Sequence, residues 1–429
     1  MSAYSSMSVE NLKSEKEKLL KKYSDFKSKN LKLDMSRGKP CTEQVELSSQ
    51  LLDIVTSKSG CKTESGVDCR NYGLLDGIPE IKKLFSEILG VSTENVMIGG
   101  NSSLNMMFDV LSCLVTHGIA GCEPWCRQEK IKFLCPVPGY DRHFTILDYF
   151  GIEPINVAML KTGPDMDAIE KIVSQDESVK GIWCVPKYSN PQGITYSDET
   201  VRRFARLQPG AKDFRIFWDN AYAIHGIEEE DDRLLNLMEE CKKTGNEDLP
   251  IIFCSTSKVT FPGSGIAAMG TSRSNLEIFK RQYFAQTIGF DKINQLRHLL
   301  YFKNLDGMKE HMKKHAAIIK PKFDAVISIL DAELADLDVC TWTRPSGGYF
   351  VSVDILPGCA KETVKLCKEA GVVMTPAGAT YPHGCDPMDS NIRIAPTYPS
   401  LDELKQAMDL FCTVVKLTAI NKILSEEKQ

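Results

Sequence analysis

From about residue 60, short uninterrupted runs of apolar residues alternate with stretches of helical periodicity. Such runs are typical of strands buried on both faces, and their alternation with helices predicts a mostly parallel sheet between helices. The runs that we interpret as strands are residues 96–99, 131–135, 155–159, 181–185, 215–218 and 251–254. Ligands bind at the carboxyl ends of strands in such sheets, so polar side chains directly after these runs are the site candidates.

The order of elements changes in the last third of the chain. A helical region over residues 303–337 contains Pro321, which predicts a kink or a break. The strand-like runs beyond it are residues 341–344, 349–354, 372–375 and 392–395, with a helix near 361–370. Ser400 and Glu403 form a capping-box pattern at the start of the last helix. These features predict a smaller α+β domain.

Three segments follow from this order. Residues 1–55 hold an amphipathic helix at 7–29 and a loop, and we expect them to join the smaller domain. Residues 56–315 form the large domain, and residues 316–429 supply the rest of the small one.

Composition excludes several classes of protein. The 429 residues are 42% apolar and 25% charged, as in soluble globular proteins. A net charge of −5 gives no attraction to nucleic acid or to an anionic membrane. The start is polar, and no run is long enough to span a bilayer. Fifteen cysteines, scattered and odd in number, indicate a reduced, cytoplasmic protein. Cys122 and Cys126 have no second Cys/His pair nearby, so we expect no metal site.

Lys258 follows the buried run 251–254, with Ser255 and Ser257 beside it. A lysine at the end of a buried strand is partly desolvated, which lowers its pKa and makes its amine a usable nucleophile. The two serines supply donors for a phosphate. This combination fits a lysine that carries pyridoxal phosphate as a Schiff base. Taken alone, so short a pattern also fits a lysine that ends a strand at the surface.

Asp219 follows another buried run, residues 215–218. An unpaired carboxylate there is costly, so it should have a cationic partner, and a pyridinium nitrogen supplies one. Tyr222, three residues on, could reach the phenolic oxygen of the same ring. A helix-capping aspartate is an equally good interpretation of Asp219 alone.

Other motifs follow the remaining strands. Residues 99–103, Gly-Gly-Asn-Ser-Ser, precede a helix whose free N–H groups could bind phosphate, or they are a plain helix cap. Tyr140 ends a Pro-Val-Pro-Gly turn and could stack on a flat ring, or pack under a loop; His143 alone would be structural. Asn190 precedes Pro191, which restricts its backbone and fixes its amide for a phenolate oxygen, unless the segment is a surface turn.

Arg393 lies inside an apolar run of the smaller domain. Arginine rarely occupies such a place unless it is paired. A guanidinium that binds a substrate carboxylate through two hydrogen bonds accounts for it, and so does a structural ion pair.

Taken in order, these motifs resemble those of the fold type I pyridoxal-phosphate aminotransferases, over about residues 35–415. More narrowly, the sequences at 36–40, 99–103 and 255–260 are similar to the bacterial aspartate aminotransferases of subgroup Ic, a MocR-like set without a DNA-binding domain. The resemblance implies a large domain with a mostly parallel seven-stranded sheet between helices, plus a smaller α+β domain.

The resemblance also implies residue roles. The catalytic residues would be Lys258, Asp219 and Tyr222. The residues expected to hold the cofactor are Tyr72, Ser102, Ser103, Tyr140, His143, Asn190, Asp219, Tyr222, Ser255, Ser257 and Lys258. Those expected to bind the substrate are Arg37, Gly38, Asn190 and Arg393. Tyr72 would reach the phosphate of a neighbouring subunit, which implies a homodimer with its active site at the subunit interface.

The chain departs from the family at two points. The family usually has an arginine for the phosphate in a Pro-Gly-x-Arg loop, and residues 262–265 here read Pro-Gly-Ser-Gly. The arginine that the partner subunit provides for a side-chain carboxylate is not identified either. The candidates are Arg37, Lys39, Lys292 and Arg297.

These inferences lead us to expect a cytoplasmic aminotransferase that moves an amino group from aspartate, or another acidic amino acid, to 2-oxoglutarate by a ping-pong reaction. A lyase or decarboxylase of the same fold is one alternative. A ligand-sensing regulator built on this fold is another, but it would need a basic DNA-binding segment, which the sequence lacks. A catalytically dead scaffold is disfavoured because every reacting position is filled.

Overall fold

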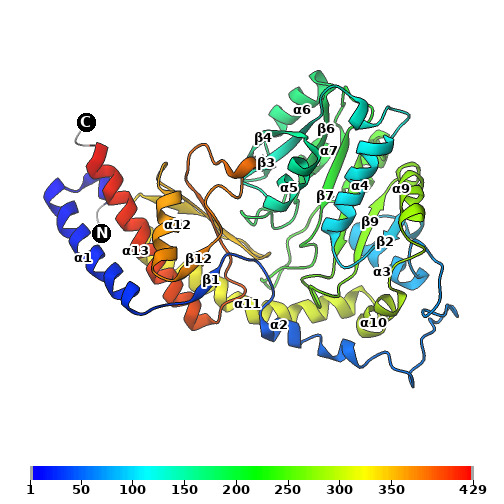
Figure 1. The fold of residues 1–429 in the computed structure, drawn as a ribbon, viewed down its shortest axis with the longest axis horizontal. Helices are drawn as coiled ribbons and strands as arrows, with labels where there is room; N and C mark the ends of the chain where they lie inside the picture. Colours follow the sequence, from blue (N-terminus) through cyan, green and yellow to red (C-terminus); the bar gives the residue numbers. More distant parts are fainter. Residues whose placement is uncertain (1–2, 427–429) are drawn as a thin grey trace.

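The computed structural model describes residues 3–426 as two bodies joined by the long helix α11 (Leu305–Leu334) (Figure 1). One body is built around an eight-stranded sheet, and the other packs around the C-terminal helix α13 (Leu401–Glu426). Within residues 3–426, no helix is both long and apolar enough to cross a membrane.

The large sheet is mostly parallel. Its strands are β2 (Val96–Ile98), β3 (Lys132–Val137), β4 (Glu153–Leu160), β5 (Gly163–Pro164), β6 (Val179–Cys184), β7 (Arg215–Asp219), β8 (Pro250–Ser255) and β9 (Ala267–Thr271). They are ordered β2-β9-β8-β7-β6-β3-β4-β5. The pairs from β8 through β4 are parallel, whereas β9 and β5 are antiparallel to their neighbours. The expected fold class is confirmed, with one strand beyond seven because two-residue β5 pairs with the end of β4 at the edge.

Helices cover both faces of this sheet (Figure 1). They are α3 (Pro79–Leu89), α4 (Ser103–His117), α5 (Asp141–Phe150), α6 (Met166–Gln175), α7 (Asp198–Ala205), α8 (Leu237–Thr244), α9 (Arg273–Gln286) and α10 (Lys292–Phe302). Phe217 of β7 faces the core formed with α4, α5 and α9, whereas its neighbours Ile216 and Trp218 face the opposite core. Because successive residues of a strand point to opposite faces, an uninterrupted apolar strand needs cover on both sides.

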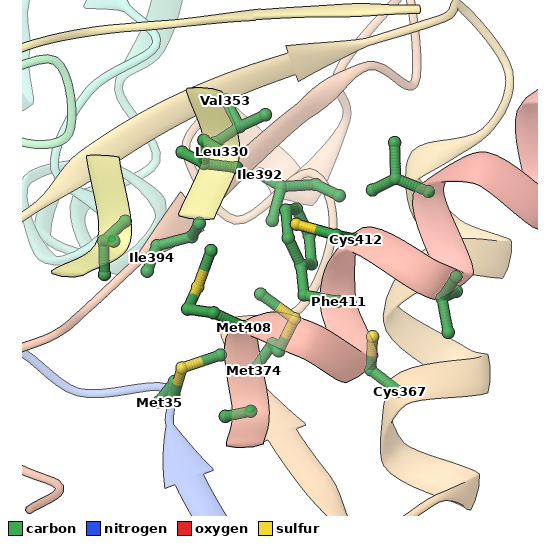
Figure 2. Close-up of a cluster of buried hydrophobic side chains, with 14 of the residues drawn as sticks. Met35, Leu330, Val353, Cys367, Met374, Ile392, Ile394, Met408, Phe411 and Cys412 are labelled. Carbon is green, nitrogen blue, oxygen red and sulfur yellow. The ribbon is translucent and has the colours of Figure 1, made fainter. Parts of the chain in front are cut away.

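The second body combines both ends of the chain. It contains α1 (Val9–Ser28), α12 (Ala360–Glu369) and α13, a parallel pair of β1 (Leu33–Met35) with β12 (Val372–Met374), and the antiparallel strands β10 (Cys340–Trp342), β11 (Val351–Ile355) and β13 (Asn391–Ile394). Figure 2 shows its core, where Phe411 and Met408 of α13 meet Leu330 of α11 and Ile394 of β13. At the start of α13, Ser400 N donates to Glu403 Oε2, and Glu403 N donates to Ser400 Oγ, as the capping box predicts.

Helix α11 links the two cores. Met312 packs in the core of the large body, and Phe323 packs in that of the small body. The helix runs through Pro321 without the break that its sequence allowed, because packing on both sides offsets one missing N–H donor. These contacts support, as a proposal, a domain boundary near residue 315 and the assignment of residues 1–55 to the small domain. The short helix α2 (Thr42–Glu46) lies along α11 (Figure 1).

Candidate active site

A cleft of about 750 Å³ opens between the two bodies at the carboxyl edge of the parallel strands. Tyr140 follows β3, Asn190 follows β6 and Lys258 follows β8, and all three line the cleft. Tyr222, in the turn after β7, lines it as well. From the small body, Arg393 of β13 completes the wall. The topology therefore brings together five polar side chains that lie far apart in the sequence.

Lys258 is buried, and its surroundings disfavour the charged form of its amine. Burial holds the pKa of Lys258 below its usual value of 10.5, and the negative charge of Asp219 acts in the opposite direction as the smaller cause. Its Nζ lies 5.1 Å from the centre of the Tyr222 ring. Burial likewise raises the pKa of the Tyr222 hydroxyl, so this group stays protonated and can donate a hydrogen bond. A neutral lysine amine is a nucleophile and a base at neutral pH.

Asp219 lies at the end of β7, with 3% of its surface exposed. His143 Nε2 lies 3.1 Å from Asp219 Oδ2, and the His143 ring stacks on Trp183 at 4.4 Å. Asp219 Oδ1 is also buried, and no group in residues 3–426 hydrogen-bonds to it. An unsatisfied buried carboxylate oxygen is costly, so it marks a place where a cationic N–H of a bound molecule fits.

Neutral donors gather beside Lys258. Ser102 caps helix α4, whose N-terminus opens toward the segment after β8. Ser257 Oγ donates to Asn101 O at 2.6 Å, and Ser255 Oγ donates to Ser257 Oγ at 3.1 Å. A Cβ on Gly265 would lie 3.0 Å from Ser257 N and 3.1 Å from Asn101 O, so glycine allows this approach. Residues 99–103 and 255–257, whose serines we predicted to bind a phosphate, therefore lie in contact in the structure. Ser103, at the first turn of α4, is buried.

The loop that lacks the usual arginine is held by an amide instead. Asn294 Nδ2 of α10 donates to Ser264 O and to Gly265 O, each at 3.0 Å. These bonds fix the backbone that contacts Ser257. They supply no positive charge, so a phosphate at this place would rely on hydroxyls, backbone N–H groups and the dipole of α4.

Arg393 is 6% exposed and uses several of its donors. Its Nη1 donates to Asp141 Oδ1 at 2.9 Å and to Asn190 Oδ1 at 3.1 Å, and its Nε donates to Thr375 Oγ1 at 3.4 Å. The guanidinium carbon lies 4.8 Å from the centre of the Phe350 ring. Asn190, which the family resemblance assigns to the cofactor, therefore contacts the arginine assigned to the substrate.

The four candidate cations for a side-chain carboxylate have different surroundings. Arg37 lines the cleft, next to Gly38. Lys39 Nζ lies 3.7 Å from the centre of the Tyr398 ring, and Lys292 Nζ donates to Gly73 O at 2.9 Å. The Nε of Arg297 is buried without a partner in the described part of the chain. Neither Lys39, Lys292 nor Arg297 lines the cleft.

Sequence reasoning missed three charged residues of the cleft: Asp141, Arg142 and Lys368. Asp141 and Arg142 directly follow Tyr140 at the first turn of α5, so their place after a strand was the available signal. Lys368 projects from α12 of the small body, and nothing in its sequence context indicates the cleft. The basic residues that line the cleft are Arg37, Arg142, Lys258, Lys368 and Arg393, and its single carboxylate is that of Asp141.

Tyr72 lies outside the cleft of its own chain, and 81% of its side chain is exposed. Phe284 and Ile288 are also large apolar residues with 80% and 60% exposure. Gly289 packs on the backbone of Gly73, so the segment after α9 lies against the Tyr72 loop. Exposed apolar residues gathered in this way are typical of a protein interface.

Comparisons with known proteins agree on one family. The family model for the aspartate amino-transferases matches residues 7–427. An aspartate aminotransferase of Corynebacterium glutamicum is 43% identical, over 97% of this chain and 97% of that protein. The crystal structure of an aspartate transaminase from the same organism superposes with a TM-score of 0.94 at 42% identity, covering 97% of this chain and 98% of that one. The α-aminoadipate aminotransferase LysN of Thermus thermophilus shares the fold at 19% identity, with a TM-score of 0.73 over 91% and 93% of the two chains.

Proposed function

The chain belongs to the aspartate aminotransferase family, and from this premise we propose that it is a pyridoxal-phosphate-dependent transaminase. It moves the amino group of L-aspartate, or of another acidic L-amino acid, to 2-oxoglutarate in a ping-pong reaction. The observation that carries the proposal is the buried Asp219, whose Oδ1 has no partner within residues 3–426 and whose charge acts on the buried amine of Lys258.

The residues present fit the proposed cofactor. Asp219 Oδ1 suits a ring N–H, Tyr140 suits the ring face, and Tyr222 with Asn190 suits the phenolic oxygen. The serines that suit the phosphate are Ser102, Ser103, Ser255 and Ser257, with Tyr72 of a second subunit beside them. When bound, pyridoxal phosphate supplies an aldehyde that takes up the amino group and a ring that withdraws electrons from the substrate Cα. The LysN structure contains N-(5'-phosphopyridoxyl)-L-leucine, which supports this assignment by analogy of fold.

Side chains of this protein would each have a separate role in the proposed reaction. Lys258 Nζ, whose pKa is lowered by burial, would move the proton between the substrate Cα and the aldehyde carbon of the cofactor within each half-reaction, in opposite directions in the two halves. The Asp219 carboxylate would face the ring nitrogen, and His143 orients this carboxylate. Arg393 orients the substrate through its α-carboxylate.

The charge of the cleft favours an acidic substrate. Apart from Lys258, four cations face a single carboxylate there, so a dianion gains more from this surface than a neutral amino acid. The relative from Corynebacterium glutamicum is named for aspartate, which supports the same choice. A lyase or decarboxylase on this fold would leave the cofactor in its aldehyde form, whereas transamination converts it to pyridoxamine phosphate, so product analysis separates the two.

We also propose a homodimer in a reducing compartment, the cytoplasm. The exposed Tyr72, Phe284 and Ile288 support a contact that carries Tyr72 to the other subunit's site. All fifteen cysteines are free, which supports a reducing compartment.

Borohydride reduction tests the proposal. In the protein incubated with pyridoxal phosphate, reduction should fix one cofactor on the peptide that contains Lys258, as mass spectrometry would show. Lys258→Ala should lose this adduct and transamination together. Lys314→Ala, which removes an exposed lysine of α11, should keep both. An adduct that persists in Lys258→Ala would refute the assignment.

A further inference from the structure

Asp141 and Arg393 form an ion pair across the cleft between the two bodies. Asp141 lies at the first turn of α5 on the large sheet, and Arg393 lies in β13 of the small body. The pair joins Asp141 Oδ1 to Arg393 Nη1 at 2.9 Å, with 35% and 7% of the two side chains exposed. The carboxylate is therefore partly exposed to solvent, whereas the guanidinium is enclosed.

The pair occupies part of the surface that a substrate carboxylate would use. An arginine binds a carboxylate best through two parallel N–H···O bonds. Nη1 of Arg393 already donates to Asp141 and Asn190, and Nε donates to Thr375, while Phe350 covers one face. A second carboxylate can pair with both terminal nitrogens only if Asp141 or Asn190 releases Nη1, and Asp141 is the partner that carries the competing negative charge.

We propose that Asp141 acts as a stand-in for the substrate carboxylate, holding Arg393 in the ligand-free protein and giving up its place when the substrate binds. This inference rests on the proposed function, because it assigns Arg393 to the substrate. Asp141 is not a catalytic residue in this proposal but a positioning residue, and it lowers substrate affinity by competing for the guanidinium.

Replacing Asp141 by a substrate carboxylate on Arg393 costs little free energy. Asp141 is partly exposed, so on release its carboxylate returns to water at little cost. Arg393 is enclosed, and an enclosed guanidinium without a carboxylate would be costly. The substrate therefore replaces one anion with another, and Arg393 remains paired throughout.

The pair also bridges the two bodies. Asp141 and Asn190 of the large body both bind the same guanidinium of the small body, so these contacts connect the two sides of the cleft. A substrate that displaces Asp141 would itself connect the two bodies, because its carboxylate binds Arg393 of the small body while its other groups bind the large body.

Calorimetric titration with succinate tests the exchange without turnover, since succinate has two carboxylates and no amino group. Asp141→Asn removes the competing charge and should lower the Kd for succinate about three- to tenfold relative to the wild type. Asp148→Asn makes the same charge change on the same helix, at a residue paired with His383 outside the cleft, and should leave the Kd unchanged. An unchanged or raised Kd in Asp141→Asn would show that Asp141 assists binding, and would overturn the proposal.

A crystal structure of the wild-type protein with succinate distinguishes displacement of Asp141 by succinate from a long-range electrostatic effect of Asp141 on succinate affinity. We expect Arg393 Nη1 to bond a succinate oxygen and Asp141 to turn away; an intact Asp141–Arg393 pair beside bound succinate would overturn the exchange. Failure of the proposed function has a different signature. In that case succinate would bind away from Arg393, or the wild-type protein would form no adduct at Lys258.

Discussion

His143 Nε2 lies 3.1 Å from one carboxylate oxygen of Asp219, and the other oxygen has no partner within residues 3–426. One oxygen is thus used to orient the side chain, which leaves the second for a ligand. Trp183 stacks on the imidazole of His143 and so holds in place the ring that orients the Asp219 carboxylate. A buried anion arranged in this way is prepared in advance to stabilise a positive charge on a bound ring.

Asp219→Asn should therefore lower kcat for aspartate and 2-oxoglutarate by about 10²–10³-fold, the usual cost of removing one preorganised electrostatic group. Asparagine keeps the shape of the side chain but loses the charge, so the adduct at Lys258 should still form. His143→Gln disturbs only the orientation of Asp219 and should cost less. Steady-state kinetics should show that kcat falls further in Asp219→Asn than in His143→Gln. A kcat of Asp219→Asn within tenfold of the wild-type value would contradict the role of the charge.

Gly38→Ala should weaken substrate binding through Phe350. A Cβ on Gly38 would collide with Phe350 Cζ, and this buried ring lies 4.8 Å from the guanidinium carbon of Arg393. The ring must move, and Arg393 with it, so we expect KM for both substrates to rise about tenfold. Combining Gly38→Ala with Phe350→Leu restores space and should recover part of the loss. If the double variant binds no better than Gly38→Ala, the ring does not transmit the effect.

The sequence predicts the fold wherever apolar runs are uninterrupted. Strands β3, β6, β7 and β8 are such runs, and the structure contains all of them. The sequence did not predict strand β9, because its residues, Ala-Ala-Met-Gly-Thr, include few of the β-branched or aromatic types that are typical of strands. Antiparallel pairing with β2 and β8 makes it a strand, and this long-range contact leaves no periodicity in the sequence.

The same limit applies to the site. Lys258 and Asp219 could be predicted because each ends a buried strand, and parallel strands end at one edge. The partner of Arg393 could not, because Asp141 lies 252 positions away in the chain and on the other body. Lys368 reaches the cleft only through the docking of α12 beside β12, which depends on tertiary packing.

Phe411→Ala should strongly destabilise the small body. Phe411 lies in the fully buried part of α13 and packs with Met408 and Leu330 (Figure 2). Truncating a buried phenylalanine leaves a cavity and typically costs about 3–5 kcal/mol. Urea unfolding followed by circular dichroism should show an earlier transition. Tyr149→Ala removes a ring that is 72% exposed and should change the midpoint little. Equal midpoints for the two variants would contradict the packing.

Lys258→Met should stabilise the cofactor-free protein at neutral pH. The pKa of Lys258 is lower in the folded protein than its ordinary 10.5, because burial disfavours the charged form more than Asp219 favours it. The unfolded chain then binds more protons than the folded one at pH values between the lowered pKa and 10.5. The free energy of unfolding therefore rises with pH across that window, and below it the lysine destabilises the fold by a constant amount.

Methionine has a similar length and no charge, so the variant should unfold at a higher temperature than the wild type at pH 7. The difference in unfolding temperature should narrow as the pH rises toward and above 10.5, because the wild-type lysine then becomes neutral in both states. Thermal unfolding of both cofactor-free proteins at a series of pH values measures this gap. Lys314→Met, at an exposed position, serves as the control and should show no narrowing. A gap that stays constant with pH would mean that the amine of Lys258 is as well solvated as an exposed lysine, and the nucleophile would then lack the neutral form on which the proposed chemistry depends.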